Sequence, residues 1–163
     1  MLLSGDTSEN IICIVIGDES EITNLVMWLR ITLLGQRDRS LHMRFLPSKI
    51  RRVVVNFVSR NIDVILSKIR MIIISCLGKF KRFKMKILSI MTNLVKKEHI
   101  TNIVLASDFD QLMKGFSSLL RKITELNILI NNKHPAIELA DILANTYRRN
   151  RKLMRKLTVY VLR

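Results

Sequence analysis

Residues 50–78 read IRRVVVNFVSRNIDVILSKIRMIIISCLG, and this stretch decides the fold class. The runs VVV (53–55) and MIII (71–74) favour β-structure. Apolar residues nevertheless recur at intervals of three or four positions, as on one face of a helix, and this longer pattern predicts helix. One helix of this length would span roughly 45 Å, so we expect a break near Asn61–Asp63. The apolar positions are Ile50, Val54, Phe57, Val58, Ile62, Ile65, Ile69, Ile72 and Cys76.

Helical spacing also appears on either side of this stretch. The acids of Asp18–Glu21 suit a helix N-terminus, and the apolar pattern that follows them ends at Gly35. Similar patterns predict further helices after Gly78, after Ser107 and from Pro135, which suits a first helical position. Only 5 glycines and 2 prolines are present, which argues against a many-stranded sheet.

The expected fold class is therefore all-α, a helical bundle formed by two small bundles joined by a linker helix. We expect residues 1–63 to form an N-terminal helical half that includes this linker helix. Residues 64–163 are expected to form a second helical half with a basic C-terminal helix, whose apolar positions extend to Leu157.

The positive charge is concentrated in parts of the chain. The formal net charge is +15, with +15 on residues 30–97 and +7 on residues 148–163, against −5 on residues 1–29 and −2 on residues 98–147. Such segregation creates a strong local field and favours a polyanionic partner. Solubility alone would not require the charge to be clustered.

Two groups of bases are expected to bind an anionic membrane surface and RNA or ribonucleoprotein. The stretch GKFKRFKMKILSI (78–90) places five bases beside apolar residues that suit a helical core face. Few aromatic residues are available for stacking, so RNA binding without base readout is expected. The expected binding residues are Arg51, Arg52, Lys79, Lys81, Arg82, Lys84, Lys86, Arg148, Arg149, Arg151 and Lys152.

The acidic N-terminal end predicts self-assembly into a homo-oligomer. Asp18, Glu19 and Glu21 would dock on the basic face of the next copy, and such a contact repeats without closing. The alternative, in which these acids fold onto the basic face of their own chain, is left open by the sequence.

The usual sequence signatures of catalytic or metal chemistry are absent. The chain has three histidines and contains no CxxC, HExxH or glycine-rich phosphate loop. Asp108 and Asp110 suit the N-terminus of a helix better than acid–base chemistry, and Ser117-Ser118 has no nearby histidine in the sequence. We therefore expect a non-enzyme that needs no cofactor, no metal and no small-molecule substrate.

The two cysteines and the longest apolar runs bear on cellular location. Cys13 and Cys76 lie in apolar runs, which predicts core thiols in a reducing compartment, with a single disulfide as the alternative. Lys68 and Arg70 interrupt the best candidate for a membrane span. The apolar run after Asn10 is preceded by acids rather than bases, so no secretory signal peptide is expected.

Six fragments occur in the order MLLSGDT (1–7), NLVMWLR (24–30), FLPSKIRRVVVNFVSRNID (45–63), KFKR (79–82), ILINNKHPAI (128–137) and DILANTYRRNRKLM (141–154). Taken together, they resemble the matrix proteins of influenza-type orthomyxoviruses. The resemblance implies two small α-helical bundles and a self-assembling layer beneath a viral envelope that also contacts ribonucleoprotein. It implies a location in the virion, in the host cytoplasm and nucleus, and at the inner face of the plasma membrane.

The chain also departs from that family. The family carries a Cys-x-x-Cys and two histidines where this chain has Ile137, Ala140, Arg148 and Arg151, so zinc is not implied. Members of the family are longer, so the resemblance implies an N-terminal part or a short divergent relative.

Three other classes stay open as alternatives. Residues 123–143 followed by a basic tail faintly resemble secreted helical cytokines of interferon-gamma type. The composition also fits a basic all-α coat protein that packages nucleic acid, as in filamentous archaeal viruses. Residues 67–97 form a basic amphipathic run that would fit a membrane-active toxin.

Overall fold

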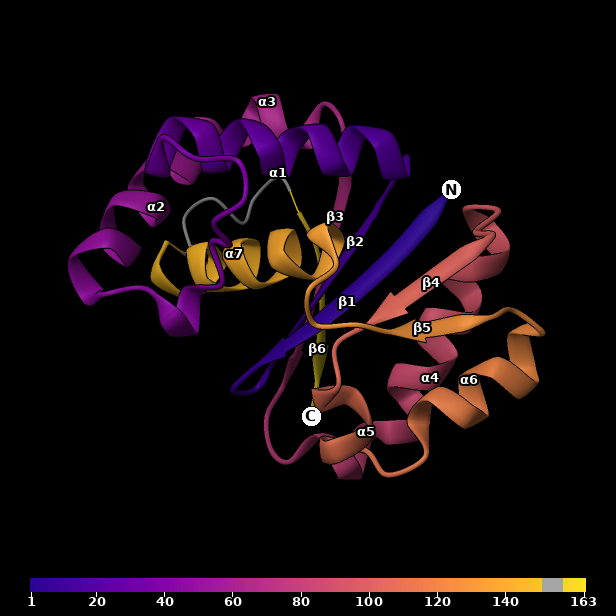
Figure 1. Ribbon diagram of the computed structural model, residues 1–163. Helices are drawn as coiled ribbons and strands as arrows, with labels where there is room; N and C mark the ends of the chain where they lie inside the picture. The colour runs from indigo at the N-terminus through magenta and orange to yellow at the C-terminus, as the bar shows by residue number, and fades with distance from the viewer. Residues whose placement is uncertain (151–156) are drawn as a thin grey trace.

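The computed structural model describes residues 1–150 and 157–163 and contains a six-stranded mixed sheet covered by helices on both faces (Figure 1). The strand order is β5-β4-β1-β2-β3-β6. β1, β2 and β3 are antiparallel to one another in succession, whereas β4 runs parallel to β1, β5 to β4, and β6 to β3. The strands are β1 (Leu2–Ser8), β2 (Ile11–Gly17), β3 (Arg70–Cys76), β4 (Asn102–Leu105), β5 (Ile128–Ile130) and β6 (Thr158–Leu162).

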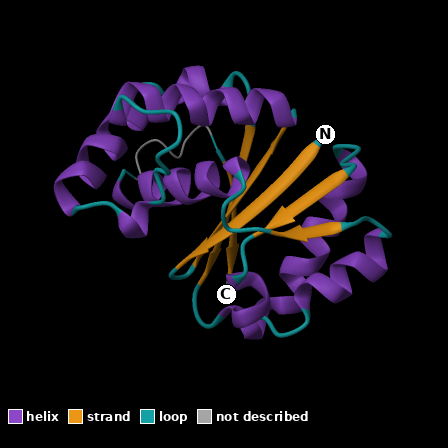
Figure 2. Ribbon diagram, viewed as in Figure 1, coloured by secondary structure: helices purple, strands orange, loops and turns teal. Residues whose placement is uncertain are grey.

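The helices form one layer on each face of the sheet (Figure 2). One layer contains α1 (Glu19–Leu34), α2 (Ser48–Arg60), α3 (Ile62–Leu66) and α7 (Pro135–Arg149), with a short 3-10 turn, η1 (Met43–Phe45), before α2. The other layer contains α4 (Phe80–Lys97), α5 (Asp108–Leu112) and α6 (Phe116–Thr124). Each layer encloses its own core; Cys13 lies in the first and Cys76 in the second, both as buried free thiols.

The prediction of an all-α bundle is wrong. Residues 70–76, expected to continue a helix, form the strand β3. Ile73 points into the core under α7, while Ile72 and Ile74 point into the core under α4, and all three are fully buried. A strand that is buried on both faces is apolar at every position, so helical spacing can be found in it without a helix being present. The run IICIVIG in β2 is buried throughout for the same reason.

Several expected helix boundaries are confirmed. Asp18 caps α1 by accepting a hydrogen bond from the Ser20 N–H at 2.9 Å, and Gly35 ends that helix with φ 67°. The expected break falls at Asn61, which separates α2 from α3. Pro135 is the first residue of α7. These features depend on neighbouring residues in the chain, which explains why the local sequence predicts them.

Both sides of residue 63 contribute strands to the single sheet. β1 and β2 precede this residue, and β3 to β6 follow it. The boundary expected between two helical halves therefore falls between β2 and β3, which are hydrogen-bonded neighbours in the sheet. The basic C-terminal helix that was expected to extend to Leu157 ends at Arg149 within the described residues, and the chain closes with β6. In the part of the chain that the structure describes, no helix is both long enough and apolar enough to cross a bilayer.

Candidate functional site

Three aspartates from separate parts of the chain line one cavity of about 220 Å³, which we call the carboxylate cavity. Asp6 lies in β1, Asp108 is the first residue of α5 just after β4, and Asp141 lies in α7. β1 and β4 are parallel neighbours, so their carboxyl ends meet at one edge of the sheet. In open α/β sheets this edge is where ligands bind.

Asp6 is held on the face of β1 that packs against α7. Two residues earlier on the same face, the Ser4 hydroxyl donates a hydrogen bond to the Ala136 carbonyl oxygen at 3.1 Å. The Asp6 side chain accepts a hydrogen bond from the Thr7 N–H at 2.8 Å. Burial, together with the negative charges of Asp141 and Asp108, raises the pKa of Asp6 to about 7, although the hydrogen bond from Thr7 acts in the opposite direction.

Asp108 is positioned by the packing of its neighbour Phe109. The Phe109 ring is fully buried against β1 at Gly5, where an added Cβ would lie only 3.0 Å from the ring's Cζ. Ser107, the residue before Asp108, is fixed by its N–H, which donates to the Asn132 side-chain oxygen at 2.8 Å. A residue larger than glycine at position 5 would therefore require the Phe109 ring, next to Asp108, to move by a few tenths of an ångström.

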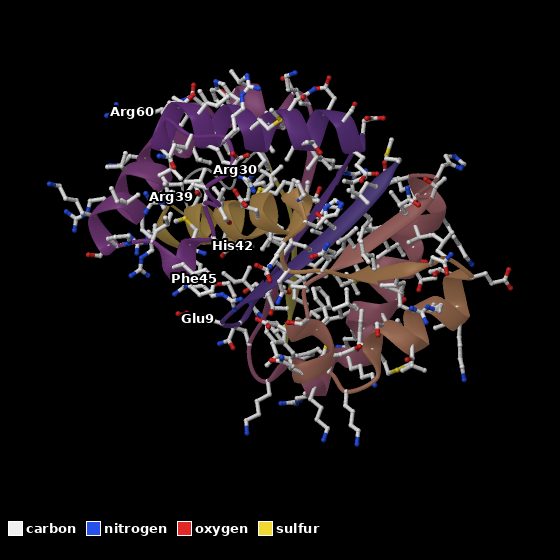
Figure 3. All side chains as sticks on the ribbon, in the orientation of Figure 1. Glu9, Arg30, Arg39, His42, Phe45 and Arg60 are labelled. Carbon is white, nitrogen blue, oxygen red and sulfur yellow. The ribbon has the colours of Figure 1, made fainter. Side chains whose placement is uncertain are left out.

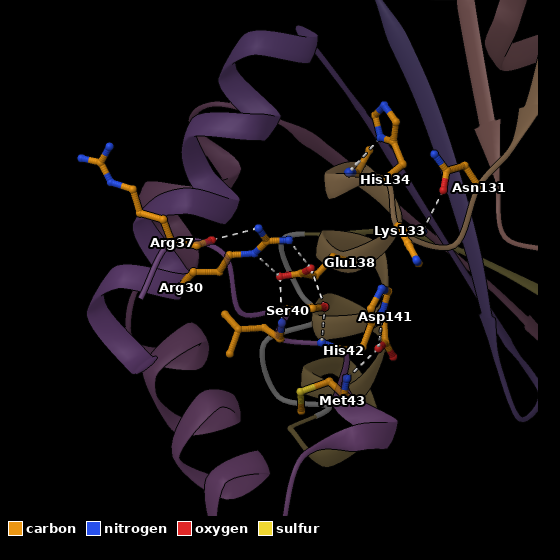
Figure 4. A network of polar contacts seen from close by, with 12 residues as sticks. Arg30, Arg37, Ser40, His42, Met43, Asn131, Lys133, His134, Glu138 and Asp141 are labelled. Carbon is orange, nitrogen blue, oxygen red and sulfur yellow. Dashed lines mark hydrogen bonds and ion pairs between the residues drawn. The ribbon is translucent and has the colours of Figure 1, made fainter. Parts of the chain in front are cut away.

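Asp141 is engaged by the segment that precedes α2 (Figure 4). Its Oδ2 accepts a hydrogen bond from the Met43 N–H at 2.8 Å and lies 3.5 Å from Nδ1 of His42. Its Oδ1 accepts from the Asn145 side chain at 2.9 Å. The contact with Asp141 raises the pKa of His42, although partial burial of the imidazole acts in the opposite direction.

The same segment is fastened to α7 by the buried carboxylate of Glu138 (Figure 4). Arg30 of α1 donates to both oxygens of Glu138, at 2.9 and 2.6 Å. The Ser40 hydroxyl and the Leu41 N–H donate to it as well, at 2.8 and 2.9 Å. Burial alone would raise the pKa of Glu138, but these hydrogen bonds, led by that of Arg30, lower it. Glu138 therefore holds the segment containing His42 against the carboxylate cavity.

Of the predicted binding residues, Arg51, Arg148 and Arg149 come together beside this site. They line a second cavity of about 700 Å³, which we call the arginine cavity. Arg51 and Arg148 also line the carboxylate cavity. Arg52, the next residue along α2, is exposed and lines neither cavity. Arg151 and Lys152 lie outside the described residues.

The remaining predicted bases lie on the other layer of helices. They start two residues after Leu77, which lines the arginine cavity, and continue through the first turns of α4. One of them, Lys84, donates a hydrogen bond from Nζ to the Lys114 carbonyl oxygen. We call this set the α4 cluster; it comprises Lys79, Lys81, Arg82, Lys84 and Lys86.

The three acids predicted to mediate self-assembly have partners within the same chain. Asp18 caps α1, and Glu21 forms an ion pair with Lys68 at 2.8 Å. Glu19 lies 3.4 Å from Nε2 of His134. We call Asp18, Glu19 and Glu21 the α1 acids.

The carboxylate cavity was missed by the sequence analysis. Asp108 was assigned to helix capping, Asp6 was counted only among the acids of the N-terminal end, and Asp141 and His42 were assigned no role. A usable signal existed, since Asp6 and Asp108 each lie at the end of a short apolar run, where a buried strand would end. Asp141 gives no such signal, because it lies on the polar side of its helix beside Glu138, Asn145 and Arg148. The signal from Asp6 and Asp108 does not identify a site until the sheet is known.

Carboxylate oxygens are the ligands that hard divalent cations such as Mg²⁺ prefer. Asp6 is buried beside two other acids, an arrangement that requires either protonation or a neutralising cation. Within residues 1–150 and 157–163, no three side chains of His, Cys, Asp or Glu lie close enough together to hold a metal ion. The donor types therefore suit a divalent cation, but in this arrangement the three carboxylates are not grouped closely enough to hold one, and Asp141 is engaged by His42.

Comparison with known proteins gives evidence on the fold. No protein-family model and no curated protein matches the sequence. Among solved structures, the chain is similar to one in the complex of PCNA with RNase HII from Archaeoglobus fulgidus, with a TM-score of 0.54 and 14% identity. The match covers 95% of this chain and 74% of the other. At this identity the likeness shows an α/β fold of the RNase HII kind.

This fold contradicts the functions expected from the sequence. A viral matrix protein, a packaging coat protein and an interferon-gamma-type cytokine were all expected on an all-α framework, whereas the chain has a mixed sheet like that of RNase HII. The fragments that resemble matrix proteins lie in strands as well as helices; MLLSGDT, for example, lies largely in β1. Local similarity of short apolar and basic segments does not carry the topology with it.

Proposed function

We propose that this chain cleaves phosphodiester bonds of a nucleic acid at the carboxylate cavity, where Asp6, Asp108 and Asp141 would have to move closer together to hold a divalent cation. The observation that supports the proposal is the convergence of these three carboxylates, from β1, α5 and α7, in one cavity. The RNase HII-like fold supports it by analogy, since that protein's name describes a ribonuclease. A divalent cation bound here would polarise a phosphate oxygen and make water a stronger nucleophile at neutral pH.

The residues that line the two cavities would have separate roles in this reaction. Asp6, whose pKa is raised to about 7, can carry a proton near neutral pH, and it would have to be ionised to hold a cation. His42 places an imidazole next to Asp141, and Glu138 holds the segment that carries it. Arg51 and Arg148, on the wall shared with the arginine cavity, would attract and orient the phosphate backbone.

The test is a cleavage assay with fluorescently labelled RNA, DNA and RNA–DNA hybrid in the presence of Mg²⁺ or Mn²⁺. The parent should cut at least one of these substrates, and chelation should abolish the cleavage. Asp6→Asn and Asp141→Asn should each lower the rate by at least 100-fold, on the order of the loss when a catalytic group is removed.

Asp110→Asn is the matched control. Asp110 lies two residues from Asp108 but outside the cavity, and its two oxygens accept hydrogen bonds from the N–H and the hydroxyl of Ser117. The asparagine oxygen can still accept from the Ser117 N–H, and the hydroxyl can accept from the asparagine NH2 group instead. The Asp110→Asn variant should therefore cleave the same substrates at the rate of the parent. Cleavage that survives Asp6→Asn and Asp141→Asn, or that is absent from the parent with every substrate and cation, would contradict the proposal.

A second candidate is a nucleic-acid-binding protein without catalysis, as expected from the basic residues. It is supported by the geometry of the described residues, in which no three metal-ligating side chains are grouped for a cation and Asp141 faces His42. The same assay separates the two, because binding of labelled RNA without cleavage under all conditions favours this second candidate.

A further inference from the structure

The arginine cavity adjoins the carboxylate cavity. Its walls come from α2, from the last turn of α7, from the β1–β2 turn at Glu9 and Asn10, and from the end of β3. Arg51, Asn145 and Arg148 line both cavities, so the two share one wall. A ligand that lies across this wall would reach from the carboxylates to the arginines.

The charge of the arginine cavity suits a phosphate group. Three arginines and one acid, Glu9, line it. Among the described residues, the buried Nε of Arg51 has no hydrogen-bond partner. A buried donor without an acceptor is unfavourable unless a ligand supplies one. The planar guanidinium group, with its fixed fork of N–H donors, matches the geometry of phosphate oxygens.

One of these arginines is restrained by an acid that a ligand would replace. Glu9, at the tip of the β1–β2 turn (labelled in Figure 3), forms an ion pair with Nη2 of Arg148. Nη1 of Arg148 donates to the Ser8 hydroxyl at 3.3 Å. The Glu9 side chain is 68% exposed, so it can turn into solvent at little cost and leave Arg148 for a different anion.

We infer that the arginine cavity is a subsite for a backbone phosphate of a nucleic-acid strand, bound by Arg51, Arg148 and Arg149. This deepens the proposed function and rests on it for the choice of a strand. A free phosphate would occupy one cavity, whereas a strand places successive phosphates along a line that can follow the shared wall. The strand would run from the carboxylate cavity across Arg51 and Arg148.

The test measures binding alone, so that it does not depend on cleavage. Fluorescence anisotropy follows a labelled DNA strand of about 12 nucleotides in excess EDTA, over a series of KCl concentrations. Arg51→Ala should weaken binding by roughly tenfold, the effect of losing one charge-assisted hydrogen bond to phosphate. It should also reduce the slope of log affinity against log salt by about 0.7, the value for one phosphate contact on a single strand.

A gain-of-binding variant keeps the test meaningful if Arg51→Ala fails to fold. Glu9→Gln removes the acid that holds Arg148, and it should tighten binding several-fold, a result that misfolding cannot produce. The matched control is Arg60→Ala. Arg60 lies at the far end of α2, is exposed (Figure 3) and lines neither cavity. Arg60→Ala should therefore bind the strand with the affinity and salt slope of the parent.

Two results would overturn the inference. In the first, folded Arg51→Ala binds the strand with the same affinity and salt slope as the parent, and Glu9→Gln does not bind it more tightly. In the second, Arg51→Ala no longer floats with phosphatidylserine vesicles but still binds the strand like the parent, a result that would assign the cavity to a lipid headgroup. Because the assay contains EDTA, a parent that binds the strand through Arg51 but never cleaves would refute only the proposed hydrolase.

Discussion

Replacing Asp6 with asparagine should stabilise the folded protein, and more so as the pH rises. The Asp6 side chain is buried, and its pKa is raised from 3.8 to about 7, first by burial and then by the charge of Asp141. Above pH 7 the folded chain must hold a buried carboxylate that the unfolded chain keeps in water. Asparagine has nearly the same shape and keeps an oxygen that can accept the hydrogen bond from the Thr7 N–H, but it carries no charge.

The magnitude follows from the pKa of Asp6. The rise from 3.8 to about 7 corresponds to about 4 kcal/mol in the free energy of unfolding, because each whole step in pKa is equivalent to about 1.4 kcal/mol. Between these two pH values the unfolded state binds fewer protons than the folded state, so this group makes the stability fall as the pH rises. The advantage of asparagine should therefore be about 2 kcal/mol at pH 5 and about 4 kcal/mol at pH 8.

Urea unfolding followed by circular dichroism at these two pH values measures both numbers. The matched control is Asp38→Asn, which removes an exposed carboxylate and should change the stability by less than about 0.5 kcal/mol. Excess Mg²⁺ should stabilise the parent more than Asp6→Asn if Asp6 helps to hold a cation. The reasoning is refuted if Asp6→Asn gains less than about 1 kcal/mol at pH 8, or gains equally at both pH values.

Four further outcomes are expected. Glu138→Ala should lower the free energy of unfolding by about 3–5 kcal/mol because it leaves Arg30 without its buried partner. Glu21→Ala breaks an exposed ion pair and should lower it by less than about 1 kcal/mol. Equal losses of stability for the two variants in urea unfolding would contradict this expectation. Phe109→Ala should cost about 3–5 kcal/mol and Phe45→Ala, at a ring 73% exposed, no more than about 0.5 kcal/mol, with thermal unfolding as the check. Replacing the α4 cluster with glutamine should weaken both RNA binding and flotation with anionic vesicles in a salt-dependent way; equal flotation of the parent with zwitterionic vesicles would count against the membrane part. Charge reversal of the α1 acids should keep the protein small in light scattering under conditions where the parent assembles, and unchanged assembly would exclude these acids as the interface.

The candidate site was only partly accessible to sequence reasoning. The bases Arg51, Arg148 and Arg149 could be found because clustered charge is visible along the chain, and the structure places all three around one cavity. The aspartates could not be found in this way. Asp6 and Asp141 are separated by 135 positions and are brought together only by the packing of α7 on β1. A single aspartate between apolar residues has no chemical meaning until its neighbours in space are known.

The sequence by itself determined the local features of this protein. Asp18 and Gly35 set the limits of α1, Asn61 divides α2 from α3, and Pro135 starts α7, because caps, turns and proline geometry act over a few residues. It also determined the excess of positive charge and its clustering. Hydrogen bonding and sterics within one or two helical turns are sufficient to set these helix limits, and the charge is a direct property of the amino-acid sequence.

Only the tertiary structure decided between helix and strand for the apolar segments, and with them the fold. β3 pairs with β2, which lies about 60 positions earlier in the chain, and with β6, which lies about 86 positions later. Its isoleucines are buried on both faces only because α7 and α4 cover opposite sides of the sheet. In a segment buried on both faces, the apolar pattern has no period by which to distinguish helix from strand. Long-range pairing therefore determined the sheet, and the sheet placed the three aspartates in one cavity.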